Sequence, residues 1–117
     1  MKPKRIEKPW GYEIIWAQTD TYVGKLLHIN TGERLSKQYH EHKEETIYVL
    51  RGVVYNYDEN DEVQRIVPGE SFHVKPGQVH RFAAWDITPV EIMEVSTNHL
   101  EDVVRLHDDY NREASDS

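Results

Sequence analysis

Two histidines and three glutamates lie within one short segment of the chain, Gln38-Tyr39-His40-Glu41-His42-Lys43-Glu44-Glu45. Imidazole and carboxylate are side-chain groups that bind divalent metals such as zinc, iron, nickel, cobalt and manganese. In a β-strand, residues of the same parity share a face, so Gln38, His40 and His42 would line one side of such a strand. The segment therefore predicts a metal-binding surface.

Glu45 follows these residues after a short bend and shares parity with Ile47 and Val49. Those two apolar side chains belong in a core, so we expect Glu45 to point inward with them. A buried carboxylate is costly unless it is paired or binds a metal. Two imidazoles and one carboxylate on a common interior would meet that requirement.

His80 supplies a further imidazole from a distant part of the chain, after a Pro-Gly turn. Alternation places His80 and Phe82 on one face of a strand and Arg81 on the other. A lone His-x-His pair is common in proteins that bind no metal. The addition of Glu45 and His80 to that pair favours a metal site inside a β fold.

Eight short runs rich in Val, Ile, Tyr, Phe and Trp must position these groups. Turn residues such as Arg51-Gly52 and Pro68-Gly69 separate the runs. Such spacing predicts an all-β fold, a small antiparallel barrel or sandwich, with no helical period before residue 98. The expected strands cover residues 12–17, 22–29, 46–50, 53–57, 63–67, 71–74, 81–85 and 90–95.

The two ends of the chain carry weaker signals. Residues 1–11 contain two prolines and a glycine, so we expect an irregular arm whose Trp10 packs across the barrel or a second subunit. In the C-terminal segment, 99–117, residues 99–110 could form a short helix or a last extended stretch. The polar residues 113–117 are expected to fray.

The composition limits the possible functions. A chain of 117 residues suits one domain, residues 1–117. With 14 Lys plus Arg against 21 Asp plus Glu, the net charge of -7 disfavours nucleic acid as a partner. Cysteine is absent, which excludes disulfides, zinc–thiolate sites and thiol nucleophiles. Without a signal-peptide pattern or an apolar stretch long enough to cross a membrane, a cytoplasmic location and no membrane partner are expected.

The spacing of the polar residues resembles the two sequence motifs of the cupin superfamily. Gln38 stands where the first motif usually has a histidine, and Lys75 and Ala84 replace a proline and an asparagine of the second. The resemblance covers about residues 24–95 and implies a small antiparallel double-stranded β-helix, or jelly-roll barrel. The residues at the motif positions are Gly32, Gln38, His40, Glu45 and Gly52 in the first motif and Gly69, Gly77 and His80 in the second.

A narrower resemblance connects the chain with the type II mannose-6-phosphate isomerase group, a module that is often the C-terminal half of a bifunctional guanylyltransferase. It implies a divalent metal (Zn, Mn, Co, Ni or Fe) bound by Gln38, His40, Glu45 and His80. Imidazole chemistry favours His42 over Gln38, so both stay candidates. The resemblance is carried by Lys8-Pro9-Trp10-Gly11-Tyr12-Glu13, by residues 35–45, by Val79-His80-Arg81 and by Asp102-Val103-Val104-Arg105.

This second resemblance implies aldose–ketose isomerisation of a sugar phosphate. The candidate proton carriers at the mouth of the barrel are His42, Glu44 and His73. An iron(II) oxygenase and a non-catalytic metal- or sugar-binding module are the alternatives. A homodimer is expected, since most cupins associate. The candidate cations for the phosphate are Arg34, Lys37, Lys75 and Arg105.

Overall fold

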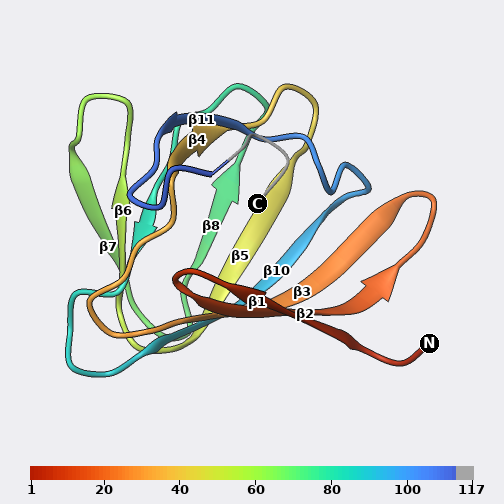
Figure 1. Cartoon of the computed structure of the whole chain (residues 1–117), viewed down its shortest axis with the longest axis horizontal. Coiled ribbons are helices and arrows are strands. Elements are labelled where there is room, and N and C mark those ends of the chain that lie inside the picture. Colours follow the sequence, from red (N-terminus) through yellow and green to blue (C-terminus); the bar gives the residue numbers. More distant parts are fainter. Residues whose placement is uncertain (113–117) are drawn as a thin grey trace.

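The computed structural model describes residues 1–112, and all of its strand pairs are antiparallel. One wall of the barrel is a six-stranded sheet (Figure 1). Its strands are, in spatial order, β1 (Lys4–Lys8), β2 (Gly11–Gln18), β3 (Tyr22–Ile29), β10 (Val90–Thr97), β5 (Glu45–Arg51) and β8 (Ser71–Val74).

Two small sheets form the opposite wall. Isolated bridges between Gln38 and His80 and between Arg34 and Ala83 join these sheets to each other. The described residues contain no helix, and the predicted all-β double-stranded β-helix is confirmed. The first small sheet contains β11 (Val104–His107) and β4 (Lys37–Tyr39), and the second contains β7 (Val63–Ile66), β6 (Val54–Tyr57) and β9 (Phe82–Ala83).

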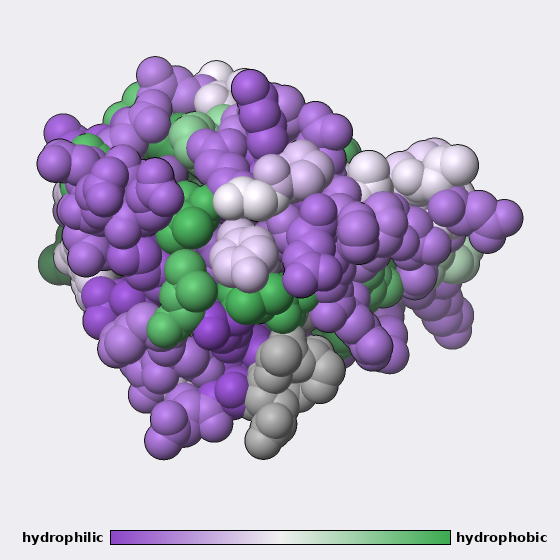
Figure 2. All heavy atoms as spheres, turned by 90° about the horizontal axis from the view of Figure 1, so that it is seen from above, coloured by the Kyte–Doolittle hydropathy of each residue, from purple (hydrophilic) through white to green (hydrophobic). Residues whose placement is uncertain are grey.

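Alternation along the strands builds the core between the two walls. On β10, for example, Val90 and Ile92 point inward and are fully buried, while Val95 is exposed on the outer face. Equivalent positions on the other strands complete one apolar cluster that lies below the polar groups described next. Figure 2 shows mainly hydrophilic side chains on the upper face, with apolar side chains gathered in a band across its middle.

The N-terminal arm differs from the prediction. Residues 4–8 form strand β1, which pairs along its whole length with β2, so the arm is a hairpin and not an irregular segment. Only the Pro9-Trp10 step is a turn. Trp10 is 2% exposed and belongs to the core cluster of its own chain. The two prolines permit this because both lie outside the paired residues of β1.

The C-terminal segment is extended, not helical. Strand β11 pairs with β4, and this pairing closes the upper part of the barrel (Figure 1). All eight predicted strand runs are confirmed, although the run at residues 81–85 shortens to β9. Of the two alternatives that the sequence left open for residues 99–110, the extended one is correct, and a register shift between Arg105 and His107 interrupts the alternation that would have indicated it. The end of the predicted segment, residues 113–117, lies outside the described residues.

Candidate metal centre

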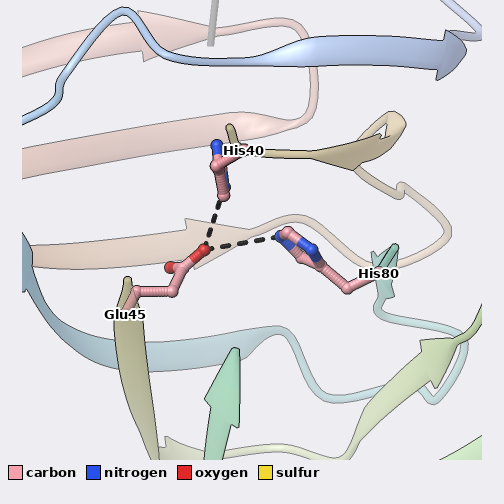
Figure 3. A group of neighbouring side chains, drawn as sticks. All are labelled: His40, Glu45 and His80. Carbon is pink, nitrogen blue, oxygen red and sulfur yellow. Dashed lines mark hydrogen bonds and ion pairs between the residues drawn. The ribbon is translucent and has the colours of Figure 1, made fainter. Parts of the chain in front are cut away.

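Three side chains converge inside the barrel from three different strands or loops: His40, Glu45 and His80 (Figure 3). The Nε2 atom of His40 lies 3.1 Å from the Oε1 atom of Glu45. The Nε2 atom of His80 lies 3.4 Å from the same oxygen. All three residues are buried, and one ligand atom from each lies within 4.8 Å of the others.

The other nitrogen of each imidazole fixes its tautomer. Nδ1 of His40 faces the backbone carbonyl of Asp102, and Nδ1 of His80 lies 3.1 Å from the carbonyl of Gln78. Carbonyl oxygens only accept hydrogen bonds, so both Nδ1 atoms carry the proton. With the rings neutral, the lone pair of each Nε2 is directed toward the carboxylate of Glu45, which is the state that a metal ligand needs. A cation between the three groups would satisfy them together, including Nε2 of His80, a buried atom without a hydrogen-bond partner. The donor set therefore fits a divalent metal.

Gln38 lies beside His80 because the two residues form a backbone bridge. Its two hydrogen bonds have nitrogen-to-oxygen distances of 3.0 and 2.9 Å. Its side chain is buried and lines the cavity around His40, Glu45 and His80. The hydroxyl of Ser36 donates to the Oε1 atom of Gln38 over 2.6 Å. That bond orients the amide oxygen and leaves its second lone pair available. Gln38 is thus placed as a fourth candidate ligand.

His42 lies outside this group. Strand β4 ends at Tyr39, and the chain bends at residues 41–42, so the two-residue period that linked His40 with His42 is broken. The ring of His42 is exposed and lies 6.1 Å from the ring of His99. The structure therefore corrects the expectation that His42 shares the inner face.

Glu44 and His73 also lie outside the cavity. The two side chains are about half exposed and pair with each other, with His73 Nε2 2.5 Å from Glu44 Oε2. His73 is in β8 opposite Thr46 and points to the outer face of the large sheet. Neither residue lines the cavity around His40 and His80, so the structure does not bring these two expected proton carriers together with the candidate ligands.

A second layer of buried charge was missed by the sequence analysis. Lys43 Nζ lies 3.2 Å from the Oε2 atom of Glu94, and both side chains are almost fully buried in the wall of the cavity. Burial and the nearby carboxylate of Glu45 raise the pKa of Glu94 to about 7. Burial alone would also raise the pKa of Glu45, but Lys43 and the two imidazoles hold it well below its ordinary value.

A second buried pair lies on β2 and β3. The Nζ atom of Lys25 is 2.9 Å from Glu13 Oε2, and Nζ of Lys8 is 3.3 Å from Oε1 of the same carboxylate. Burial opposes ionisation of Glu13, yet the two lysines leave its pKa below the ordinary value. Alternation could have revealed these groups, since Glu13 shares parity with Ile15, and Lys25 with Leu27.

The cations expected to bind phosphate lie away from the cavity. Arg34 is paired with Asp109 at 2.7 Å and Lys37 with Asp61 at 3.1 Å, both in a separate hollow on the outer side of the small sheets. Lys75 is exposed beside the turn before His80. Arg105 is half-buried on β11, opposite Gln38. Of these four residues, none lines the cavity around His40 and His80.

The fold defines the chain as a double-stranded β-helix domain that carries a candidate metal centre. The sequence model of the family described as "Mannose-6-phosphate isomerase C-terminal" matches residues 2–108. The chain therefore belongs to this mannose-6-phosphate isomerase C-terminal family. The match spans both the N-terminal hairpin and β11, so it covers the whole barrel.

Curated relatives match almost the whole chain but are much longer. Mannose-1-phosphate guanylyltransferase ManC of Salmonella typhimurium is 34% identical over 93% of this chain, and the match covers 23% of its own length. The mannose-1-phosphate guanylyltransferase of Escherichia coli is 33% identical over the same shares. The xanthan biosynthesis protein XanB of Xanthomonas campestris is 27% identical. The chain thus spans about a quarter of the length of the relatives it matches.

Solved structures share the fold. A double-stranded β-helix protein from Klebsiella pneumoniae has a TM-score of 0.72 and 21% identity, covering 89% of this chain and 84% of that one. A sugar phosphate isomerase of the cupin superfamily from Silicibacter pomeroyi has a TM-score of 0.69 and 18% identity, covering 76% and 60%. Among residues 1–112, no helix is long and apolar enough to cross a membrane.

Proposed function

We propose that the chain is a metal-dependent isomerase that interconverts the aldose and ketose forms of a phosphorylated sugar. The observation that carries the proposal is the convergence of two imidazole lone pairs and a carboxylate in the barrel interior. His40, Glu45 and His80 would hold the ion, with Gln38 as a fourth ligand. A bound divalent ion supplies charge stabilisation for the oxygen atoms that become negative during enolisation.

Isomerisation also needs a group that moves a proton between neighbouring carbons. Glu94 is the carboxyl group that lines the cavity from β10 without belonging to the candidate metal ligands. Lys43, which is bound to Glu94 on the inner side of the barrel, offers an ammonium group that can stabilise a negative substrate oxygen. We assign the proton transfer to Glu94 and the electrostatic role to Lys43.

The relatives support sugar-phosphate chemistry in a general way. The relatives are named as mannose-1-phosphate guanylyltransferases, but the matched part is about a quarter of each protein. The family that covers this part is described by an isomerase name. We therefore propose isomerisation, and not nucleotidyl transfer, as the activity of this barrel.

Proton NMR in heavy water tests the proposal. Protein loaded separately with zinc, cobalt and manganese is mixed with mannose 6-phosphate or fructose 6-phosphate. We expect the other isomer to appear, with deuterium entering at C2. Glu94→Gln should abolish deuterium entry, while Glu44→Gln, which changes an exposed carboxyl, should leave it intact.

No exchange with any of the metals, in protein that binds them stoichiometrically, would overturn the isomerase proposal. Oxygen consumption by the iron-loaded protein would then favour the oxygenase alternative. Sugar binding without turnover would favour the binding module. The expected homodimer stays a prediction, which size-exclusion chromatography with light scattering tests.

A further inference from the structure

A second cavity adjoins the candidate metal centre. It has a volume of about 280 Å³ and lies between the inner face of the β1–β2 hairpin and the connection that follows β10. The two cavities share Glu13, Lys25 and Leu100 in their walls, so they are neighbours with these three side chains between them. The hairpin lies at the lower edge of the barrel in Figure 1. Strand β1, which was not expected from the sequence, therefore builds one wall of this cavity.

Three lysines face the second cavity. Lys25 is buried, Lys8 has a side chain that is 11% exposed, and Lys4 is exposed at the rim. The acidic residues in the same wall are Glu13, which both Lys8 and Lys25 contact, and the exposed Glu101. The wall thus carries three positive and two negative groups. This local excess of positive charge contrasts with the net charge of -7 of the chain.

The buried lysines have unused capacity for hydrogen bonds. An ammonium group has three N–H donors. The interaction found for Nζ of Lys8 and for Nζ of Lys25 is with one oxygen each of Glu13. Two ammonium groups sharing one carboxylate repel each other, and burial strengthens that repulsion. A second anion beside Glu13 would relieve it.

The small size of the inner cavity favours a site of this kind. The space beside His40 and His80 has a volume of about 30 Å³, enough for an ion and a few waters. A six-carbon sugar phosphate is larger than this space. We therefore place the body of such a substrate in the wider second cavity, with its carbonyl end toward the candidate metal ligands.

The other basic hollow does not serve this purpose. Its cations, Arg34, Lys37 and Arg81, are paired with Asp109 or Asp61. It shares no wall residue with the cavity around His40 and His80. An anion bound in that hollow would lie outside the barrel, apart from the candidate metal centre.

We propose that the second cavity binds the anionic group of the substrate, with Lys8 and Lys25 as the principal donors and Lys4 closing the rim. This inference rests on the proposed function, for which the anion is the phosphate of a sugar phosphate. Glu13 holds the two inner lysines in place when no anion is bound. The hairpin is therefore a phosphate-recognition element, and the sequence candidates Arg34 and Lys37 are not.

Binding measurements by calorimetry on the zinc-loaded protein test the assignment independently of turnover. The ligands are mannose 6-phosphate, mannose and inorganic phosphate. Lys8→Gln should weaken binding of mannose 6-phosphate about tenfold, the loss expected for one hydrogen bond between charged groups, and leave mannose unaffected. Lys37→Gln is the matched control and should bind like the wild type.

Two further variants protect the test from a folding defect. Lys4→Gln changes an exposed residue and should weaken mannose 6-phosphate binding about twofold to threefold through lost long-range attraction. Glu13→Gln should have the opposite effect, tightening inorganic phosphate several-fold, because it removes the competing carboxylate. A structural defect would not tighten binding. Wild-type affinities in Lys8→Gln and Glu13→Gln, or a loss confined to Lys37→Gln, would overturn the assignment.

Turnover, measured in parallel, separates this inference from the proposed function. For an active enzyme, Lys8→Gln should raise KM about tenfold with little change in kcat. Turnover with an unchanged KM would overturn the phosphate site and leave the isomerase. Phosphate binding that depends on Lys8, without turnover, would support the site and overturn the isomerase.

Discussion

The Nδ1 atom of His40 donates a hydrogen bond to the backbone carbonyl oxygen of Asp102, 62 residues further along the chain. The side chain of Asp102 accepts three more bonds, from the backbone N–H groups of Glu41, His42 and Lys43. A single residue in the connection after β10, Asp102, therefore orients the ring of a candidate ligand and holds the loop between His40 and Glu45. Neither contact could be seen in the sequence.

Asp102→Ala should lower both stability and metal affinity. The change leaves three N–H groups of the 41–43 loop without their acceptor, and we expect a loss of about 1–3 kcal/mol in the free energy of unfolding. The more mobile loop should also weaken zinc binding. Urea unfolding and zinc titration measure the two effects. Asp86→Ala, which removes one bond from Tyr55, is the control and should keep the wild-type zinc affinity. Equal zinc affinities in the two variants would contradict the role of Asp102.

His80→Ala should abolish metal retention, because it removes one of three converging donors while the strands stay paired. Glu45→Gln should weaken metal binding by at least tenfold, since it replaces the buried carboxylate on which both imidazoles converge. Glu44→Gln changes the exposed neighbour and should have no effect. Elemental analysis after dialysis checks all three variants. Full metal content in His80→Ala, or equal losses in the two glutamate variants, would argue against the candidate centre.

Gly52→Ala should be much more damaging than Gly69→Ala. Both glycines have positive φ angles, +75° and +91°, so an alanine is strained at either site. At Gly52 an added Cβ would also lie 2.4 Å from the backbone oxygen of Pro89, while at Gly69 it would meet nothing within 4 Å. We expect an additional loss of about 1–3 kcal/mol for Gly52→Ala. Urea denaturation of both variants measures the difference. Equal midpoints for Gly52→Ala and Gly69→Ala would contradict the prediction.

The contact between Asp108 and Arg112 should make the C-terminal segment sensitive to acid. Burial tends to raise the pKa of Asp108, but the bonds from Arg112 outweigh it and leave the pKa below the ordinary value. A carboxyl whose pKa is depressed by folding stabilises the protein above its unfolded pKa of about 4, and this contribution is lost as the pH falls through the folded pKa. The stability difference between wild type and Asp108→Asn should therefore shrink as the pH falls from about 5 to about 2. A stability difference that stays constant over that pH range would contradict a stabilising role for the ionised carboxylate of Asp108.

The sequence predicted the barrel well because its strands obey the two-residue period. Glu45, His80 and the candidate ligand Gln38 were placed correctly on the inside by parity or motif spacing. Parity failed for His42 because β4 ends at Tyr39, and the strand period does not continue through the bend. The limits of a strand depend on tertiary pairing, in this case with β11.

The buried charges show a different limit. Glu94 shares parity with Ile92, and Lys25 with Leu27, so the two-residue period could have placed both charged groups inside. Lys43 gives no such signal, because it lies in a loop whose path is set by Asp102. The sequence did not indicate strand β1 at residues 4–8, because its side chains are mostly polar. Its regular backbone comes from pairing with β2.

The carbonyl of Asp102 and strand β11 are supplied by residues that are synthesised after all the candidate metal ligands. On the ribosome, a nascent chain that has exposed residues 1–96 holds His40, Glu45 and His80 but lacks the group that orients His40 and the strand that covers Gln38. The contacts that orient the candidate ligands are therefore complete only after residues 102–107 have left the ribosome.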